Sequence, residues 1–167
     1  MMIPFQSFML TLVNVATTLH INGKIWGLAI IYWGLGAPMS IFLYQGFAKG
    51  IPLELEESAL IDGCNQFQLF TRIIFPMLKS CTATVTIINV MWIWNDYLLP
   101  FLVIGNKTGS KTLTLELYFA KLTSGQYGNP WELIFPAVFV TIIPIIILYI
   151  FLQKYIVAGV SEGAVKM

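Results

Sequence analysis

Glu57 is the acidic residue of this sequence with the most unusual surroundings. In a helix, its neighbours four residues before it and three, four and seven residues after it are Leu53, Leu60, Ile61 and Cys64. A carboxylate within such an apolar face is costly to bury alone, and an arginine from a packing partner would remove most of that cost. The spacing therefore predicts that Glu57 forms an ion pair with another polypeptide.

Two signals bound the helix that would present Glu57. Pro52 fits the first turn of a helix, where its missing N–H is not needed, and Gly63 fits the left-handed position that ends one. The opposite face of this helix is polar and holds Glu54, Ser58, Asp62 and Asn65. The sequence thus predicts a short amphipathic helix from 53 to 63.

A second short helix is predicted directly after the first. Asn65 and Gln68 have the spacing of a capping box. Apolar residues then recur at helical spacing up to Pro76, namely Phe67, Phe70 and Ile74. Two short helices at a membrane surface could pass a displacement, imposed on the first of them by a partner, to the span that follows. The alternative is a solvated loop on lipid headgroups, with Arg72 and Lys79 against phosphates.

Composition places these helices beside a membrane. Of 167 residues, 57% are apolar and only 10% are charged, which is too few for the surface of an ordinary soluble domain. Apolar stretches of about 20 residues must cross lipid as helices, because lipid offers backbone amides no other partner. About four such spans are predicted, at residues 1–20, 25–48, 78–103 and 132–153.

We therefore expect an all-α polytopic membrane protein, with one transmembrane domain over residues 1–167. An even number of spans returns the chain to its starting side, so the loop at 49–77 and the tail at 154–167 are expected on the same face. The lysine and arginine counts of the two sides are too similar to give the orientation.

Several chemistries are not expected. Cys64 and Cys81 have no histidine or further cysteine at ligand spacing, so neither a metal site nor a disulfide is predicted. The net charge of +1 gives no basis for binding nucleic acid. The sequence lacks the phosphate-binding Gly-x-x-x-x-Gly-Lys-Ser/Thr loop and the His-Glu-x-x-His pattern. We expect no enzyme activity and no cofactor bound by this chain itself.

The third apolar stretch holds candidates for contact with a transported solute, namely Asn89, Trp94, Asn95 and Asp96. A carboxylate inside a membrane is by default a functional hypothesis, because it is expensive to place there. Asp96 lies near the end of its stretch among aromatic residues that suit an interfacial belt, so helix capping or subunit packing is the alternative. Hydrogen bonds between helices explain Asn89 and Asn95 equally well.

The pattern around Glu57 resembles the EAA motif of the permease subunits of bacterial ABC importers. That motif reads Glu-Ala-Ala, three residues, Gly, nine residues, Ile, one residue, Leu-Pro. The matching positions here are Glu57-Ser58-Ala59, Gly63, Ile73 and Phe75-Pro76, with every spacing kept. Ser58 stands where alanine is usual and Phe75 where leucine is usual.

Further matches resemble the carbohydrate-uptake branch of these permeases, which is similar to the second membrane subunit of the maltose transporter. They are Phe47 with Ile51-Pro52, Trp94-Asn95-Asp96-Tyr97, Thr112-Leu113-Thr114, and Gly159 with Gly163-Ala164-Val165-Lys166. Such permeases usually have six spans, and the resemblance starts near the end of their third span. An N-terminal truncation of the permease fold is therefore predicted.

The resemblance also implies how the protein would be driven. Two permease subunits form the pathway, and each lays a cytoplasmic coupling helix into a cleft of one of two ABC ATPase subunits, which bind and hydrolyse the ATP. The docking residues of this sequence are then Glu57, Ser58, Ala59, Leu60, Asp62, Gly63 and Pro76. The cytoplasmic tail reaches toward the ATPase interface, through Gly159, Gly163 and Lys166.

The remaining partners follow from the same resemblance. An extracytoplasmic solute-binding protein would deliver a carbohydrate to the loops around Lys24 and at 105–130. The protein would be a multi-pass component of the bacterial cytoplasmic membrane. Two alternatives stay open: a membrane scaffold that docks a partner without transport, and a permease for a solute other than sugar.

Overall fold

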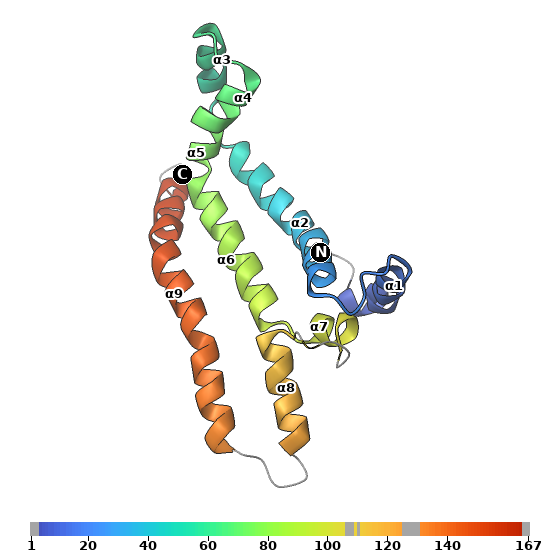
Figure 1. Ribbon diagram of the computed structural model, residues 1–167. Coiled ribbons are helices and arrows are strands. Elements are labelled where there is room, and N and C mark those ends of the chain that lie inside the picture. Colours follow the sequence, from blue (N-terminus) through green and yellow to red (C-terminus); the bar gives the residue numbers. More distant parts are fainter. Residues whose placement is uncertain (1–3, 106–108, 110, 125–130, 165–167) are drawn as a thin grey trace. The chain divides into compact units, whose positions relative to one another are not determined.

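The computed structural model describes residues 4–105, 109, 111–124 and 131–164. All regular elements among these residues are helical, which confirms the all-α prediction. In chain order they are α1 (Phe5–Thr18), α2 (Ile25–Ala48), α3 (Leu53–Ile61), α4 (Gln66–Leu69), the π-helical turn η1 (Phe70–Ile74), α5 (Phe75–Met77), α6 (Lys79–Asn95), α7 (Leu98–Val103), α8 (Leu113–Ser124) and α9 (Trp131–Ala164), as Figure 1 shows.

The chain divides into two compact units, and three long helices contribute to both. Unit 1 comprises Met1–Gly36 and Val90–Ile146, and unit 2 comprises Ala37–Asn89 and Ile147–Met167. The first half of α2, the end of α6 and the first half of α9 therefore belong to unit 1, while their other halves belong to unit 2.

The core of unit 1 is built around the short helix α7. Leu99, Val103 and Ile104 are almost completely buried there, together with Leu28 and Tyr32 of α2 and Leu115 of α8. The turn between α1 and α2 is tied to the same core, because the Gly23 N–H donates to the carbonyl of Val103 at 2.7 Å. The six residues of α7 thus form the centre at which α1, α2 and α8 meet.

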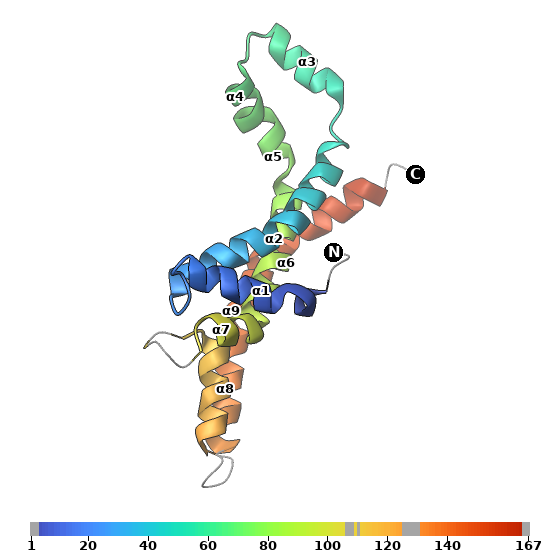
Figure 2. The same ribbon diagram turned by 90° about the vertical axis from the view of Figure 1, so that its right-hand side faces the viewer.

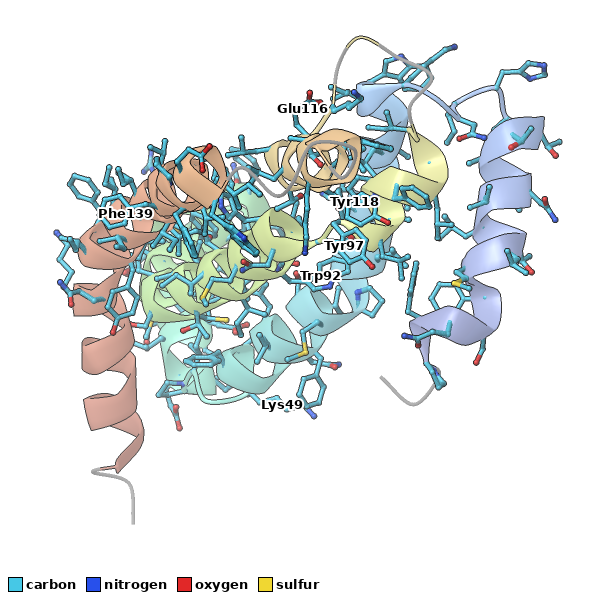
Figure 3. All side chains as sticks on the ribbon, turned by 90° about the horizontal axis from the view of Figure 1, so that it is seen from below. Lys49, Trp92, Tyr97, Glu116, Tyr118 and Phe139 are labelled. Atoms are coloured by element: carbon cyan, nitrogen blue, oxygen red, sulfur yellow. The ribbon has the colours of Figure 1, made fainter. Side chains whose placement is uncertain are left out.

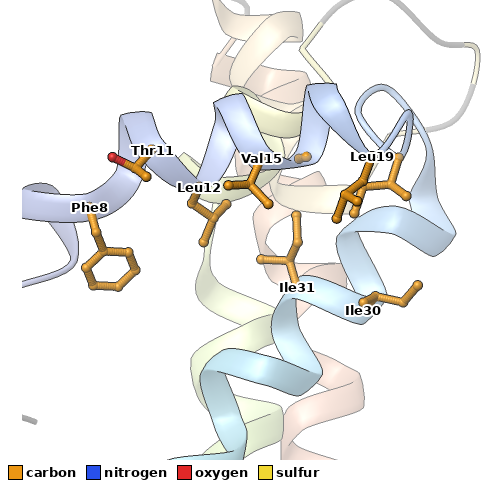
Figure 4. A pocket seen from close by; sticks show the side chains of 9 residues that line it. Phe8, Thr11, Leu12, Val15, Leu19, Ile30 and Ile31 are labelled. Atoms are coloured by element: carbon orange, nitrogen blue, oxygen red, sulfur yellow. The ribbon is translucent and has the colours of Figure 1, made fainter.

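The start of α2 packs closely against the turn that precedes it. A Cβ atom placed on Gly27 would collide with the carbonyl oxygen of Ile21, so this position requires glycine. Beside the contact, α1 and α2 border an apolar groove of about 360 Å³. Figure 4 shows Leu12 and Val15 of α1 directed toward Ile31 of α2 across this groove.

In unit 2, the chain leaves the membrane-length helix α2 and returns into α6 through a helical hairpin. Residues 53–77, which contain α3, α4, η1 and α5, form this hairpin. Figures 1 and 2 show that it projects beyond the C-terminal end of α2 and the N-terminal end of α6. At its base, Leu78, Cys81 and Val85 are buried against Leu43, Tyr44, Ile51 and Ile74.

Two helices of the described residues are long and apolar enough to cross a membrane, namely Ile25–Ala48 and the segment Ile134–Lys154 of α9. A third span results if Gln66–Met77 and Lys79–Asn95, which meet at a bend of 71°, are counted as one. With 14 residues, α1 is roughly 21 Å long, shorter than the hydrocarbon core of about 30 Å. The four spans therefore stay a prediction, with α1 the least supported of them.

Three boundaries differ from the sequence prediction. The helix expected over 78–103 stops at Asn95 and restarts at Leu98. The segment 105–130, expected as a loop, contains the helix α8. The last helix runs to Ala164 rather than ending near 153, so most of the expected tail is helical. Hydropathy marks the part of a helix that suits lipid, and a helix continues beyond that part wherever its backbone bonds continue.

Candidate functional site

The helix that carries Glu57 has the ends that the sequence predicts. Pro52 stands just before α3 with φ −63° and ψ 134°, and Gly63 follows it with φ +83°. The Cys64 N–H donates to the carbonyl of Ala59 at 3.0 Å, and the Gly63 N–H donates to that of Leu60 at 3.1 Å. This pair of bonds is a Schellman motif, which needs a left-handed residue at the position of Gly63.

The restart of the hairpin also follows the prediction. The Gln68 N–H donates to Oδ1 of Asn65 at 2.9 Å, and the Asn65 N–H donates to Oε1 of Gln68 at 3.0 Å. The two bonds form a complete capping box at the start of α4. Local bonds therefore fix where α3 ends and where α4 begins.

The sequence did not predict the π-helical turn that follows. The residues Phe70–Ile74 form a wider turn, although Phe67, Phe70 and Ile74 are spaced as in an α-helix. Pro76 gives the physical reason. It has no N–H for the carbonyl of Arg72, and its ring crowds that carbonyl in an α-helix, so a wider turn relieves the contact.

The apolar face of α3 is exposed along its length. The exposed fractions are 63% for Leu53, 45% for Leu60 and 86% for Ile61, and Glu57 between them is exposed as well. The inner side of the hairpin is buried instead, with Ala59 and Leu69 each 5% exposed. The carboxylate of Glu57 thus lies on an apolar surface that no described part of the chain covers.

The charged residues of α3 and its cap are all acidic. The helix and its cap carry Glu54, Glu56, Glu57 and Asp62, and the sequence has no lysine or arginine between Lys49 and Arg72. The described residues provide no ion pair for the Glu57 carboxylate; an ion pair that they do contain joins Lys111 and Glu116 at 3.2 Å. A partner with basic groups around an apolar cleft would complement this surface.

Asp96, the acidic candidate of the third apolar stretch, is bonded within unit 1. The Tyr32 hydroxyl donates to Oδ2 of Asp96 at 2.9 Å. Oδ1 accepts from the N–H groups of Leu98 at 3.0 Å and Leu99 at 3.4 Å, which are the first two of α7. The Thr114 hydroxyl donates to the Asp96 main-chain carbonyl at 2.8 Å. The capping alternative for Asp96 is confirmed, and it explains the break between α6 and α7.

The other polar candidates of α6 are also hydrogen-bonded. Asn89 Nδ2 donates to the hydroxyl of Ser40 on α2 at 3.0 Å, which confirms a hydrogen bond between helices at this position. Trp94 Nε1 donates to the carbonyl of Thr141 on α9 at 3.0 Å, in the turn before the helix-disrupting Pro144. Asn95 Nδ2 donates to Met91 on its own helix, and Asn95 is exposed.

Aromatic rings lie around the break between α6 and α7, which is called the Asp96 junction below. Tyr32 and Trp92 meet edge to face with ring centroids 5.6 Å apart. Tyr97 and Tyr118 are stacked at 5.4 Å, and they lie beside each other in Figure 3. The sequence motifs include Tyr97 and Thr114 without relating them to each other, and they do not include Tyr32, Trp92 or Tyr118. The signal that could have found Thr114 was the Thr112-Leu113-Thr114 match, since Thr112 accepts from the Leu115 N–H at the start of α8 and Thr114 bonds to the Asp96 carbonyl.

Two other predicted regions are described only in part. Lys24 Nζ donates to the carbonyl of His20 at 2.9 Å and lies over the Trp26 ring at 5.1 Å. Gly159 and Gly163 lie within α9, whereas Lys166 lies outside the described residues. The groups of histidine, cysteine and acidic residues among the described residues include none that could hold a metal ion.

Comparison with known proteins gives one family for nearly the whole chain. Residues 1–162 match the model of the binding-protein-dependent transport system inner membrane component. The chain is 43% identical to a probable starch degradation products transport system permease protein (AmyC) of Thermoanaerobacterium thermosulfurigenes, over 99% of this chain and 59% of that protein. It is 41% identical to the multiple sugar-binding transport system permease protein MsmG of Streptococcus mutans, over 98% of this chain and 58% of that protein.

A more distant relative has a different described cargo. The chain is 26% identical to the osmoprotective compounds uptake permease protein GgtD of Synechocystis, over 99% of this chain and 55% of that protein. The chain thus spans little more than half the length of these curated relatives. No solved structure matches it.

Proposed function

Because this chain belongs to the family of inner membrane components of binding-protein-dependent transport systems, we propose that it is a permease subunit of an ATP-binding cassette importer for carbohydrate. It would form part of the pathway in the bacterial cytoplasmic membrane, as a multi-pass protein beside a second permease subunit. The names of its relatives, which concern starch degradation products and multiple sugars, support the carbohydrate assignment.

The observation that carries the proposal is the exposed surface of α3. Leu53, Leu60 and Ile61 are largely exposed and surround a carboxylate that has no ion pair among the described residues. An ATPase cleft with an apolar floor and a basic side chain would bury the apolar groups and pair Glu57. Two copies of such an ATPase would serve the two permease subunits, and each would bind and hydrolyse the ATP.

The docking residues divide by their burial. Glu57, Ser58, Leu60 and Asp62 are exposed and would touch the ATPase. Ala59 is buried, so it would act by allowing close packing inside the hairpin. Gly63 would act through the Schellman motif that ends α3, and Pro76 through the wide turn before it. The helical end of α9, with Gly159 and Gly163, and the following Lys166 would add a second contact with the ATPase.

Transport itself would follow from differential binding. ATP-driven closure of the two ATPases would draw the coupling helices together and favour one orientation of the spans over the other. The shift can be no larger than the difference in binding free energy between the two states. An extracytoplasmic solute-binding protein would deliver the sugar near Lys24 and the segment 105–130. This chain would perform no catalysis.

For contact with the sugar, the geometry favours Asn95 among the four candidates. Asp96, Asn89 and Trp94 each form a hydrogen bond to a residue on another helix. Asn95 is exposed and its amide donates to a carbonyl of its own helix, so this amide is the group best placed to exchange that bond for one to a sugar hydroxyl.

The docking test compares two acids on the same helix. The chain would be co-expressed with its ATPase and second permease, and the ATPase retained on the tagged chain would be measured. Glu57→Gln should lower this retention, whereas Glu54→Gln, on the polar face, should leave it near wild type. Undiminished retention after Glu57→Gln would overturn the docking assignment.

The cargo is tested separately. Reconstituted complex should show ATP-dependent uptake of labelled oligosaccharides. The relative named for osmoprotective compounds supports one competing cargo class, so uptake of small compatible solutes is measured in parallel. Uptake of these solutes without sugar uptake would replace the carbohydrate assignment. Retention of the ATPase without any uptake would favour the non-transporting scaffold.

A further inference from the structure

The connection between the hairpin and α6 is sharply bent, and side chains of α2 and α6 form hydrogen bonds at the bend. The helical segments before and after Leu78 meet at 71°. Leu78 itself leaves helical geometry, with ψ of 14°, directly after the π-helical turn and α5. Irregular turns of this kind are where helices hinge. A displacement applied to α3 would be absorbed here unless something held the angle.

Thr82 holds the carbonyl at the bend. The Leu78 carbonyl accepts from the Thr82 N–H at 2.8 Å and from the Thr82 hydroxyl at 2.9 Å. Such a hydroxyl bond to the carbonyl four residues earlier favours helix bending. The same hydroxyl bond occurs at Thr84 and Thr86 within α6, so what distinguishes Thr82 is that its acceptor is the carbonyl at the bend.

Tyr44 of α2 completes the arrangement. Its hydroxyl donates to Oγ1 of Thr82 at 3.0 Å. A threonine hydroxyl has one donor and two acceptor positions, so Thr82 can donate to Leu78 and accept from Tyr44 at the same time. The result is a relay from Tyr44 through Thr82 to Leu78, which links α2 to the bend that begins α6.

The relay lies in an apolar cluster that joins both ends of the hairpin. Ile51, which precedes α3, and Ile74, which ends η1, pack with Leu78, Cys81 and the Tyr44 ring. Cys81 is completely buried and Leu78 is 6% exposed. Tyr44 and Thr82 themselves are half-buried beside this cluster, and its low polarity strengthens the hydrogen bonds that they make.

A second bond keeps α2 and α6 in register within unit 2. Asn89 donates to Ser40, at positions one helical turn from Tyr44 and two turns from Thr82 on the same pair of helices. The two levels of polar contact resist sliding of one helix along the other. The hairpin is therefore mounted on two helices that are connected to each other.

We propose that Tyr44 and Thr82 are positioning residues that fix the angle of the hairpin, so that movement imposed at α3 reaches α2 and α6 together. The inference rests on the proposed function, because it concerns how docking is converted into movement of spans. Its geometric content stands apart from transport and is tested first.

The geometric test measures the hairpin angle by spin labels within unit 2. Ile61→Cys and Phe42→Cys provide exposed labelling sites, in a Cys64→Ser background, while the native Cys81 is completely buried. The full chain is placed in lipid nanodiscs and measured by pulsed electron resonance. Tyr44→Phe, which removes one oxygen, and Thr82→Val should each broaden the distance distribution. Thr82→Ser keeps the hydroxyl and should retain the narrow one.

Two outcomes would overturn the positioning role. One is an unchanged distribution for Tyr44→Phe and Thr82→Val. The other is an equal broadening in Thr82→Ser, since that would show that loss of packing rather than of the hydroxyl is responsible. A purely structural role would lower the unfolding midpoint and leave the distance distribution of the folded protein in place.

The functional test measures the ATP hydrolysed per sugar imported by the assembled complex. Tyr44→Phe should retain ATPase docking and raise this ratio roughly threefold, the factor that corresponds to about 0.6 kcal/mol for one hydrogen bond between membrane helices. An unchanged ratio in a variant with a broadened distribution would contradict the transmission of movement. A wild-type complex that imports no sugar would instead refute the proposed function. The distance measurement would still test whether Tyr44 and Thr82 fix the angle of the hairpin.

Discussion

Asp96 in unit 1 and Glu57 on α3 are both acids among apolar neighbours, and their surroundings differ in one respect. Both carboxylate oxygens of Asp96 accept hydrogen bonds from its own chain, from Tyr32 and from the start of α7. Glu57 is exposed beside uncovered leucine and isoleucine side chains, with no ion pair among the described residues. An acid whose partners are internal contributes to the fold, whereas the proposed function assigns the partner of Glu57 to a second molecule. Four substitutions separate these two situations.

Asp96→Ala should give the largest effect on stability. It leaves the Tyr32 hydroxyl and the first N–H groups of α7 without their acceptor, and it should lower the free energy of unfolding by about 3 kcal/mol. Unfolding in mixed detergent micelles measures the change. Asp96→Asn keeps an acceptor for α7 and should lose clearly less. If Asp96→Ala unfolds like wild type, the internal bonding of Asp96 does not stabilise the fold and the contrast with Glu57 fails.

Ile61→Ser should show the opposite distribution of effects. Ile61 is 86% exposed, so its removal should leave the unfolding free energy within error of wild type. Docking of the ATPase should weaken by about 1.5 kcal/mol, roughly a tenfold change in dissociation constant. Equilibrium binding of the purified ATPase to the chain in nanodiscs provides the measurement. A loss of stability with unchanged docking would place Ile61 in the core of the hairpin and not on its contact surface.

Gly63→Ala tests how firmly the contact surface is oriented. The residue has φ of +83°, and a Cβ atom added there would meet only open space, so backbone strain alone opposes the substitution. The expected cost is about 1 kcal/mol, divided between the stability of the hairpin and the docking affinity. Hydrogen exchange of the Cys64 amide should accelerate, because that amide closes the Schellman motif. Unchanged exchange would show that α3 keeps its end without the glycine.

Lys111→Ala should have the smallest effect. Its partner Glu116 is 61% exposed, and exposed ion pairs contribute about 0.5 kcal/mol or less. The unfolding free energy should therefore change little, and the change should vanish at high salt. A loss comparable to that of Asp96→Ala would mean that the packing of Lys111 over Phe119, rather than the charge, supports α8.

The hairpin was the most predictable part of the chain because its determinants are local. The Schellman motif at Gly63 and the capping box of Asn65 and Gln68 use bonds to residues at most five positions away, and both are present, while Pro52 stands just before α3. The π-helical turn was missed because Phe67, Phe70 and Ile74 fit an α-helix as well, and hydrophobic spacing does not report the effect of Pro76 on the turn before it.

The Asp96 junction was less predictable for the opposite reason. Its partners Tyr32 and Thr114 lie 64 and 18 residues away in sequence, and only the packed fold brings them to one carboxylate and one carbonyl. Capping of α7 by Asp96 involves neighbours two and three residues away, and such local capping can be expected from the sequence. The helix α8 was missed because glycines and polar residues before and after it favour a loop, although Thr112 is a fitting first cap.

The helix α9 is longer than the part of it that suits lipid. Its lipid-compatible segment finishes at Lys154, and the helix continues to Ala164. Those extra turns rise roughly 15 Å. The helical residues up to Ala164 accordingly extend by that distance past the segment that suits lipid, so a molecule that binds the end of α9 would do so about that far from the segment.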